Sequence, residues 1–92
     1  MARSKPSIIL QDRQQSKTLD VCAAQAVYAV YYRGRPIKLR TSHNDLYDGF
    51  KYLKTCFPES GHAISLARKL NQRFNTQDFA VCELRVGRMF NI

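Results

Sequence analysis

The sequence predicts a small α+β domain, in which an antiparallel sheet of three or four strands carries two or three helices packed on one face. Strand-type residues and a period of two mark residues 26–41, whereas apolar residues at helical spacing mark residues 42–57 and 62–74. A chain of 92 residues can enclose one core but not two. We therefore expect a single domain over residues 1–92, with residues 1–6 as a flexible basic terminus.

The first part of the chain predicts one strand and one ambiguous segment. Residues 7–11 carry consecutive aliphatic side chains and predict a strand, and the polar residues 12–17 predict a loop. Residues 18–25 allow two structures. Thr18 could cap a short helix with Asp20 in its first turn, where negative charge is favoured, or the segment could extend the following strand. Of the two structures, we expect the helix.

Residues 26–40 predict a β-hairpin. Residues 26–32 are rich in Val and Tyr, which favour a pleated surface. Gly34 and Pro36 then mark the turn, because both residue types interrupt regular structure. Over residues 37–41 apolar side chains alternate with cations, which places the apolar side chains inside and the cations outside.

The second half of the chain predicts two helices and a final strand. Ser42 followed by Asp45 resembles a capping box, and the helix that it starts would end before Pro58. The apolar residues that would share the buried face of this helix are Leu46, Phe50, Leu53 and Phe57. Those of the second helix are Ala63, Ile64, Ala67, Leu70 and Phe74. Residues 79–86 predict the last strand.

Positive charge is the strongest functional signal. Fifteen Lys and Arg against seven Asp and Glu give a net charge of +8, and an excess of this size usually serves an anionic partner. Arginine offers a planar fork to phosphate, and tyrosine can stack on an unpaired base. The competing interpretation is a solvated basic surface that only aids solubility. The residues predicted to bind a partner or nucleic acid are Tyr32, Arg33, Arg35, Lys38 and Arg40 on the hairpin and Arg68, Lys69 and Arg73 on the second helix.

The sequence shows no set of residues at the spacing that a catalytic or metal site requires. His43 and Asp45 form the only cluster of acid–base type, and a polar loop before a helix explains it better. Cys22, Cys56 and Cys82 are far apart and pair with no histidine at zinc spacing. Glycine-rich phosphate loops are also absent. We expect no enzyme activity, no cofactor, no metal and no small-molecule substrate.

The cysteines and apolar runs indicate a cellular location. An odd number of widely spaced cysteines disfavours a secreted disulfide framework, so we expect buried thiols in a reducing compartment. The apolar run at residues 8–10 is too short for the core of a signal peptide. No run approaches the roughly 20 apolar residues of a transmembrane helix. These features predict a soluble cytoplasmic protein without a membrane partner.

In these respects the whole chain resembles phage-encoded anti-CRISPR proteins, in particular the small basic inhibitors of the type I-F surveillance complex. The resemblance covers length, charge, the lack of a catalytic set and the α+β layout between Ile8 and Val86. It implies a non-catalytic inhibitor in the bacterial host cytoplasm. Such an inhibitor docks on subunits of the CRISPR surveillance complex, sometimes also on its guide RNA, and blocks hybridisation of target DNA. Residues 31–36 and the helix carrying Arg68 and Lys69 are the expected contacts.

Two other functions fit the sequence. A small basic nucleic-acid-binding module or regulator would use the same cations but would bind naked RNA or DNA tightly. A small nuclease would depend on His43 and Asp45, so loss of function in His43→Ala with the fold intact would favour it.

Overall fold

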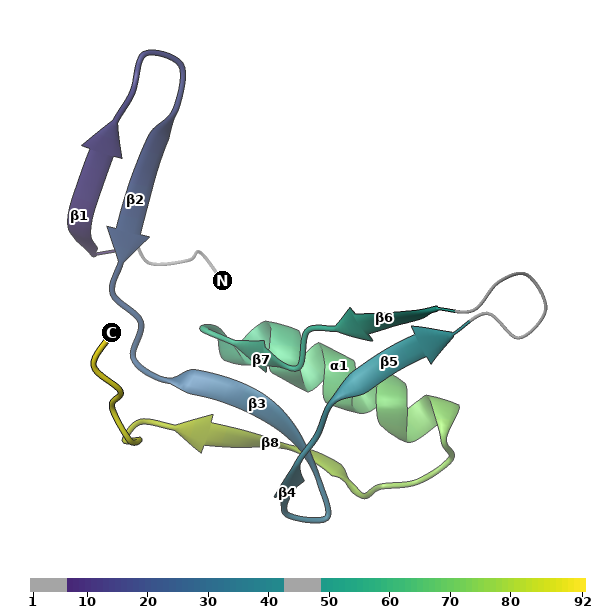
Figure 1. Cartoon of the computed structure of the whole chain (residues 1–92). Helices are drawn as coiled ribbons and strands as arrows, with labels where there is room; N and C mark the ends of the chain where they lie inside the picture. Colours follow the sequence, from purple (N-terminus) through teal and green to yellow (C-terminus); the bar gives the residue numbers. More distant parts are fainter. Residues whose placement is uncertain (1–6, 43–48) are drawn as a thin grey trace.

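The structure, a computed structural model, describes residues 7–42 and 49–92. Within these residues eight strands and one helix follow one another along the chain (Figure 1). In order, they are β1 (Ile8–Arg13), β2 (Thr18–Cys22), β3 (Val27–Tyr32), β4 (Arg35–Pro36), β5 (Leu39–Ser42), β6 (Phe50–Leu53), β7 (Cys56–Phe57), α1 (Ser60–Arg73) and β8 (Phe79–Leu84). The expected α+β class holds, but these residues form one helix in place of two or three.

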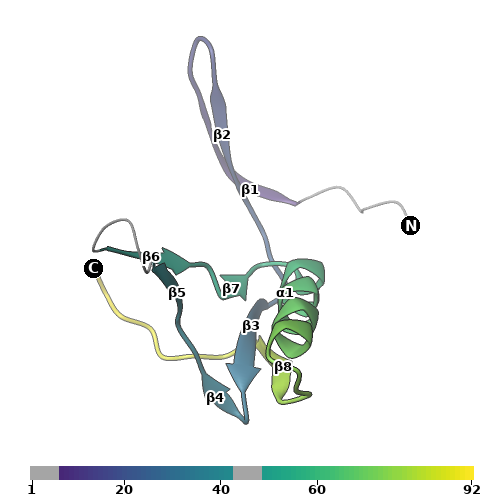
Figure 2. The same ribbon diagram turned by 90° about the vertical axis from the view of Figure 1, so that its right-hand side faces the viewer.

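The centre of the molecule is an antiparallel sheet built around β3. Strand β8 pairs with one edge of β3 along its whole length, while β4 and β7 pair with the other edge. As a result Ala29 has Cys82 as its partner on one side and Cys56 on the other. Helix α1 packs against one face of this sheet and contacts β3, β7 and β8 (Figures 1 and 2).

A small set of small side chains forms the core between α1 and the sheet. Val30 of β3 is 1% exposed and packs against three residues of α1 that lie on successive turns of one helix face. These helix residues are Ala63, Ala67 and Leu70. Since two of the three are alanines, the helix can lie close to the strand. Of the predicted helix face, Ile64 is 38% exposed and Phe74 is 60% exposed, so the buried stripe is narrower than expected.

The end of α1 is joined to the start of β8 by one side chain. Asn71 donates from Nδ2 to the carbonyl oxygen of Phe79 at 3.0 Å and accepts from its backbone N–H at 2.9 Å. The amide thus bonds both backbone groups of one residue, as a neighbouring strand would. Asn75 has a positive φ of 50°, a conformation that Asn tolerates just beyond a helix, and the chain turns back there toward the sheet.

Two hairpins extend from this centre. Strands β1 and β2 form one, which makes no substantial contact with another described element, and β5 and β6 form the other, which packs against the core through Leu39 (Figure 1). The radius of gyration is 17.0 Å, whereas a compact chain of 92 residues has about 12 Å. The accessible surface is 8879 Å², against about 5,500 Å² for a compact chain of this mass.

The structure corrects two predicted helices. The helix predicted before Pro58 is wrong in its described part, since residues 50–53 and 56–57 are strands. Their aromatic residues fit a pleated surface, and β5 and β3 offer edges on which they can pair. The helix preferred for residues 18–25 is also wrong, because residues 18–22 pair with β1 as the strand alternative allowed. The strands predicted at residues 7–11 and 79–86 are confirmed over residues 8–11 and 79–84, and β1 continues to Arg13, into the segment predicted as a loop.

The three cysteines differ in their exposure to solvent. Cys22 and Cys56 are exposed and Cys82 is half-buried, so the expectation of buried thiols is wrong for the first two. The predicted flexible terminus at residues 1–6 lies outside the described residues. No helix in the described part of the chain is long and apolar enough to cross a membrane.

Candidate nucleic-acid interface

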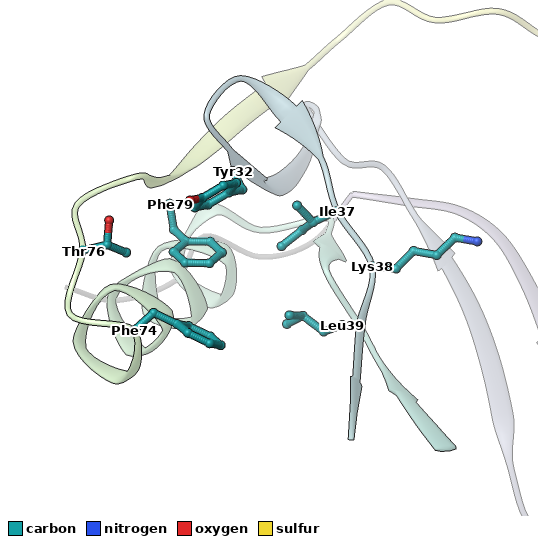
Figure 3. A pocket seen from close by; sticks show the side chains of 7 residues that line it. All are labelled: Tyr32, Ile37, Lys38, Leu39, Phe74, Thr76 and Phe79. Carbon is teal, nitrogen blue, oxygen red and sulfur yellow. The ribbon is translucent and has the colours of Figure 1, made fainter. Parts of the chain in front are cut away.

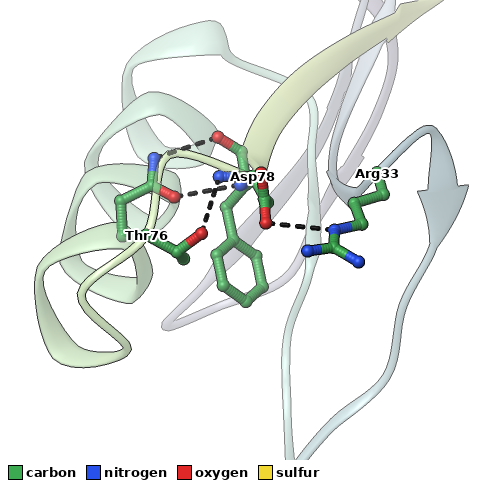
Figure 4. A network of polar contacts seen from close by, with 5 residues as sticks. Arg33, Thr76 and Asp78 are labelled. Carbon is green, nitrogen blue, oxygen red and sulfur yellow. Dashed lines mark hydrogen bonds and ion pairs between the residues drawn. The ribbon is translucent and has the colours of Figure 1, made fainter.

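The tip of the β3–β4 hairpin is a two-residue turn made by Arg33 and Gly34. Both residues have positive φ, 50° and 77°, which matches the turn type whose twist suits a β-hairpin. Glycine adopts this conformation freely, whereas Arg33 needs support from its surroundings. Asp78 supplies it twice: its carbonyl accepts the Arg33 backbone N–H at 3.1 Å, and its Oδ2 accepts from Arg33 Nε at 3.0 Å (Figure 4).

This contact gives Arg33 a structural role beside its predicted binding role. A hydrogen bond with the Thr76 side chain and, second, the bond from Arg33 hold the pKa of Asp78 below its ordinary value. The carboxylate therefore stays charged at neutral pH and occupies one side of the guanidinium. The Arg33 side chain is still 70% exposed, so its remaining N–H groups face solvent.

The other hairpin cations lie on a segment that pairs first with β3 and then with β6. Strand β4 is only two residues long, and after Pro36 the chain leaves β3 and continues as β5, which pairs with β6. The predicted alternation still holds. Ile37 and Leu39 are half-buried and pack against the core, whereas Lys38 and Arg40 are exposed, as is Arg35.

Two aromatic side chains that the sequence did not indicate accompany Arg40. Across the β5–β6 ladder, Arg40 pairs with Tyr52 and Ser42 pairs with Phe50, so Arg40, Phe50 and Tyr52 share one face. The Arg40 guanidinium lies 4.0 Å from the centre of the Phe50 ring. Phe50 is 60% exposed and Tyr52 is 62% exposed. This exposed face combines a cation with two flat rings; the prediction of Phe50 as a core residue is wrong.

A hollow of about 480 Å³ lies between the hairpin segment and the residues that follow α1 (Figure 3). Its rings are in contact, since the Phe79 ring centre is 4.9 Å from that of Tyr32 and 5.8 Å from that of Phe74. The residues that line it are Tyr32, Ile37, Lys38, Leu39, Phe74, Thr76 and Phe79. Seen from close by, the apolar side chains gather around the hollow and the Lys38 amine points away from it.

The three helix cations are exposed as predicted; Lys69 and Arg73, four residues apart, are neighbours on one side of α1, and Arg68 lies apart from them. Counted from the buried Ala67, Arg68 and Lys69 lie on the outward side of α1, about 100° apart. Arg73 is in the last turn, where a cation is favoured by the helix dipole, and directly precedes Phe74 at the hollow. Of the predicted binding cations, Lys38 therefore lines the hollow and Arg73 is the sequence neighbour of a lining residue.

Acidic, cysteine and histidine side chains are dispersed over the described residues. Over residues 7–42 and 49–92, no three His, Cys, Asp or Glu side chains gather as a metal would require. His62 lies against Phe57, with ring centres 5.8 Å apart, and its Nε2 is 3.9 Å from a Glu59 oxygen. His43 and Asp45, the cluster with acid–base character, lie outside the described residues.

Comparison with known proteins adds no relative to this description. No protein-family model, no curated protein and no solved structure matches the chain.

Proposed function

We propose that the protein is a non-catalytic binding protein that docks on a ribonucleoprotein through the β5–β6 hairpin and the cations beside it. The observation that carries the proposal is the face of Arg40, Phe50 and Tyr52, where a guanidinium and two exposed rings lie together. Bases stack on aromatic rings, and arginine pairs with phosphate, so this combination suits an RNA strand with accessible bases.

The exposed cations Arg35 and Lys38 extend this face along the chain. Among the described residues neither cation has an ion-pair partner, whereas Arg33 is paired with Asp78. Phosphates running along the hairpin could therefore meet Arg35, Lys38 and Arg40 in turn. The resemblance to anti-CRISPR proteins supplies the specific partner of the proposal, the CRISPR surveillance complex with its guide RNA, and the consequence, a block of target-DNA hybridisation.

Salt dependence separates this proposal from a plain nucleic-acid-binding module. Contact with about four RNA phosphates gives a log–log slope of binding against salt near −3, at about −0.7 per phosphate. Apolar contacts with protein subunits depend on salt much less. The proposal thus predicts tight binding to the assembled complex that persists in moderate salt, and weak binding to free RNA of the same sequence. Equal affinities and equally steep slopes for both targets would favour the plain module.

A matched pair of charge reversals tests the location of the contact. Lys38→Glu with Arg40→Glu reverses two cations of the proposed face, and Arg13→Glu with Lys17→Glu reverses two exposed cations on the β1–β2 hairpin. Both double variants change the net charge equally. The first should lose binding to the complex while the second retains it. Equal loss in both would indicate attraction by net charge alone and would overturn the proposed site.

A further inference from the structure

We propose that the chain forms a dimer with a second copy of itself. In this dimer the hairpin of β1 and β2, called the arm below, packs against the central sheet of the other copy. This inference does not depend on the proposed function, and its test requires no nucleic acid. It rests on the arm, on an open strand edge and on the surface area of the single chain.

The arm is a two-stranded ribbon without support. Every residue of β1 and β2 is exposed, and the arm projects from the rest of the molecule in both views (Figures 1 and 2). Its ladder places Leu10, Leu19 and Val21 on one face, with Asp12 opposite Leu19, and the three apolar side chains are 65%, 68% and 46% exposed. An isolated two-stranded hairpin is marginally stable in water, so this apolar face needs a surface to cover it.

The central sheet offers such a surface. Strand β8 pairs only with β3 among the described strands, which leaves its outer edge unpaired, and unpaired edges readily accept a further strand. Val30, Phe79 and Val81 pack with α1, so the alternate residues of β3 and β8 face away from the helix. On that open face Val27 is 44% exposed and Leu84 is 39% exposed.

The surface area of the chain is large enough to include a dimer interface. The accessible surface of 8879 Å² exceeds that of a compact chain of this mass by about 3,400 Å². Obligate homodimers bury about 1,000–2,500 Å² on each subunit. The excess is therefore large enough to supply an interface of the obligate class.

Two properties favour a second copy over another protein as the occupant. Each chain carries both the strand donor and the strand acceptor, and a reciprocal exchange between two copies closes with twofold symmetry and leaves neither unpaired. The arm is also neutral, because Asp12 and Asp20 balance Arg13 and Lys17, so it can approach a like-charged chain of +8 without carrying net repulsion of its own.

Substitutions on the arm test the dimer. We would measure molar mass by light scattering over a range of concentrations for the unmodified chain and two variants. Leu10→Lys with Leu19→Lys charges the apolar face of the arm, while Gln15→Lys with Ser16→Lys adds the same charge at its exposed tip. The unmodified chain and the tip variant should show twice the 10.6 kDa of one chain, and the face variant should not.

Hydrogen exchange decides the case even if the face variant does not fold. In the dimer of the unmodified chain, amides of the arm and the outward-facing amides of β8 should both exchange slowly, whereas in a monomer both would exchange fast. A measured molar mass of 10.6 kDa for the unmodified chain at every concentration would overturn the proposal. So would a dimer in which the face variant still assembles, or one in which these amides exchange fast.

Discussion

Asn71 shows how a single side chain can replace part of a strand. Its amide makes two hydrogen bonds to the backbone of Phe79, each of which contributes about 0.5–1.5 kcal/mol in a typical protein. Asn71→Ala should therefore lower the free energy of unfolding by about 1–3 kcal/mol, measured by urea denaturation. Gln72→Ala, at the exposed neighbouring position, is the control. Equal stabilities of the two variants would show that the clamp contributes nothing.

Asp78 gives the protein a specific dependence on pH. Its pKa is lowered by Thr76 and Arg33, so the carboxylate is more stable in the folded state than in the unfolded chain. A carboxyl group with a lowered folded pKa stabilises the fold above its unfolded pKa of about 3.9, and this contribution is lost as pH falls through the folded value.

We accordingly predict that Asp78→Asn is less stable than the unmodified chain at neutral pH, and that the difference shrinks as pH falls below about 4. Thermal unfolding of both proteins from pH 7 to pH 2.5 measures it. A difference that stays constant over this range would mean that the charge on Asp78 does not support the turn at Arg33.

At the scale of elements, the β5–β6 hairpin should separate binding from stability. Phe50 is 60% exposed, and substitutions at the surface usually change stability by less than about 0.5 kcal/mol. Phe50→Ala should therefore melt like the unmodified chain but bind the proposed RNA-containing partner more weakly by about 1–3 kcal/mol, the value of one stacked base. A thermal unfolding scan and a calorimetric titration on the same preparation measure the two properties. Unchanged binding would remove this face from the site.

The contact between α1 and the sheet should not accommodate a larger side chain at Ala63. Ala63 is fully buried against Val30, and inserting larger side chains into a packed core typically costs about 1–3 kcal/mol. Ala63→Leu should lower the unfolding free energy by that amount. The same change in side-chain bulk at the exposed Ser65, as Ser65→Leu, is the control. Tolerance of Ala63→Leu would mean that helix and strand can move apart at little cost.

Sequence patterns predicted the elements whose spacing and residue types favour one structure. They failed over residues 50–57, where the pattern suits both a helix and strands and the pairing partner selects the structure. The helix at residues 60–73 and the strands at 27–32 and 79–84 follow from spacing and residue type. Over residues 50–57, apolar residues at helical spacing also suit two short strands, and only the edges of β5 and β3 select the strands. The exposed ring of Phe50 was missed for the same reason, since the wrong element put it on a buried face.

For the whole molecule, the stability of the chain should depend on its concentration. Only six apolar residues within the described segments are buried, and four of them are alanines, which is a small core for a chain of this length. If dimer formation supplies the missing burial, the melting temperature should rise with protein concentration, because mass action favours the paired state. Scans over a hundredfold dilution would measure this. A concentration-independent melting temperature would require a monomer stable on its small core.

The position of Ala29 between two cysteines has a consequence for oxidation. Cys56 and Cys82 are partners of Ala29 on opposite sides, so their Cα atoms lie two strand spacings apart, about 9–10 Å. A disulfide needs Cα atoms about 4.4–6.8 Å apart, so the folded sheet prevents these two thiols from joining. In an unfolded chain nothing keeps them apart. A bond formed there would leave no room for β3 between its neighbours, and air oxidation during refolding would trap the chain outside its native fold.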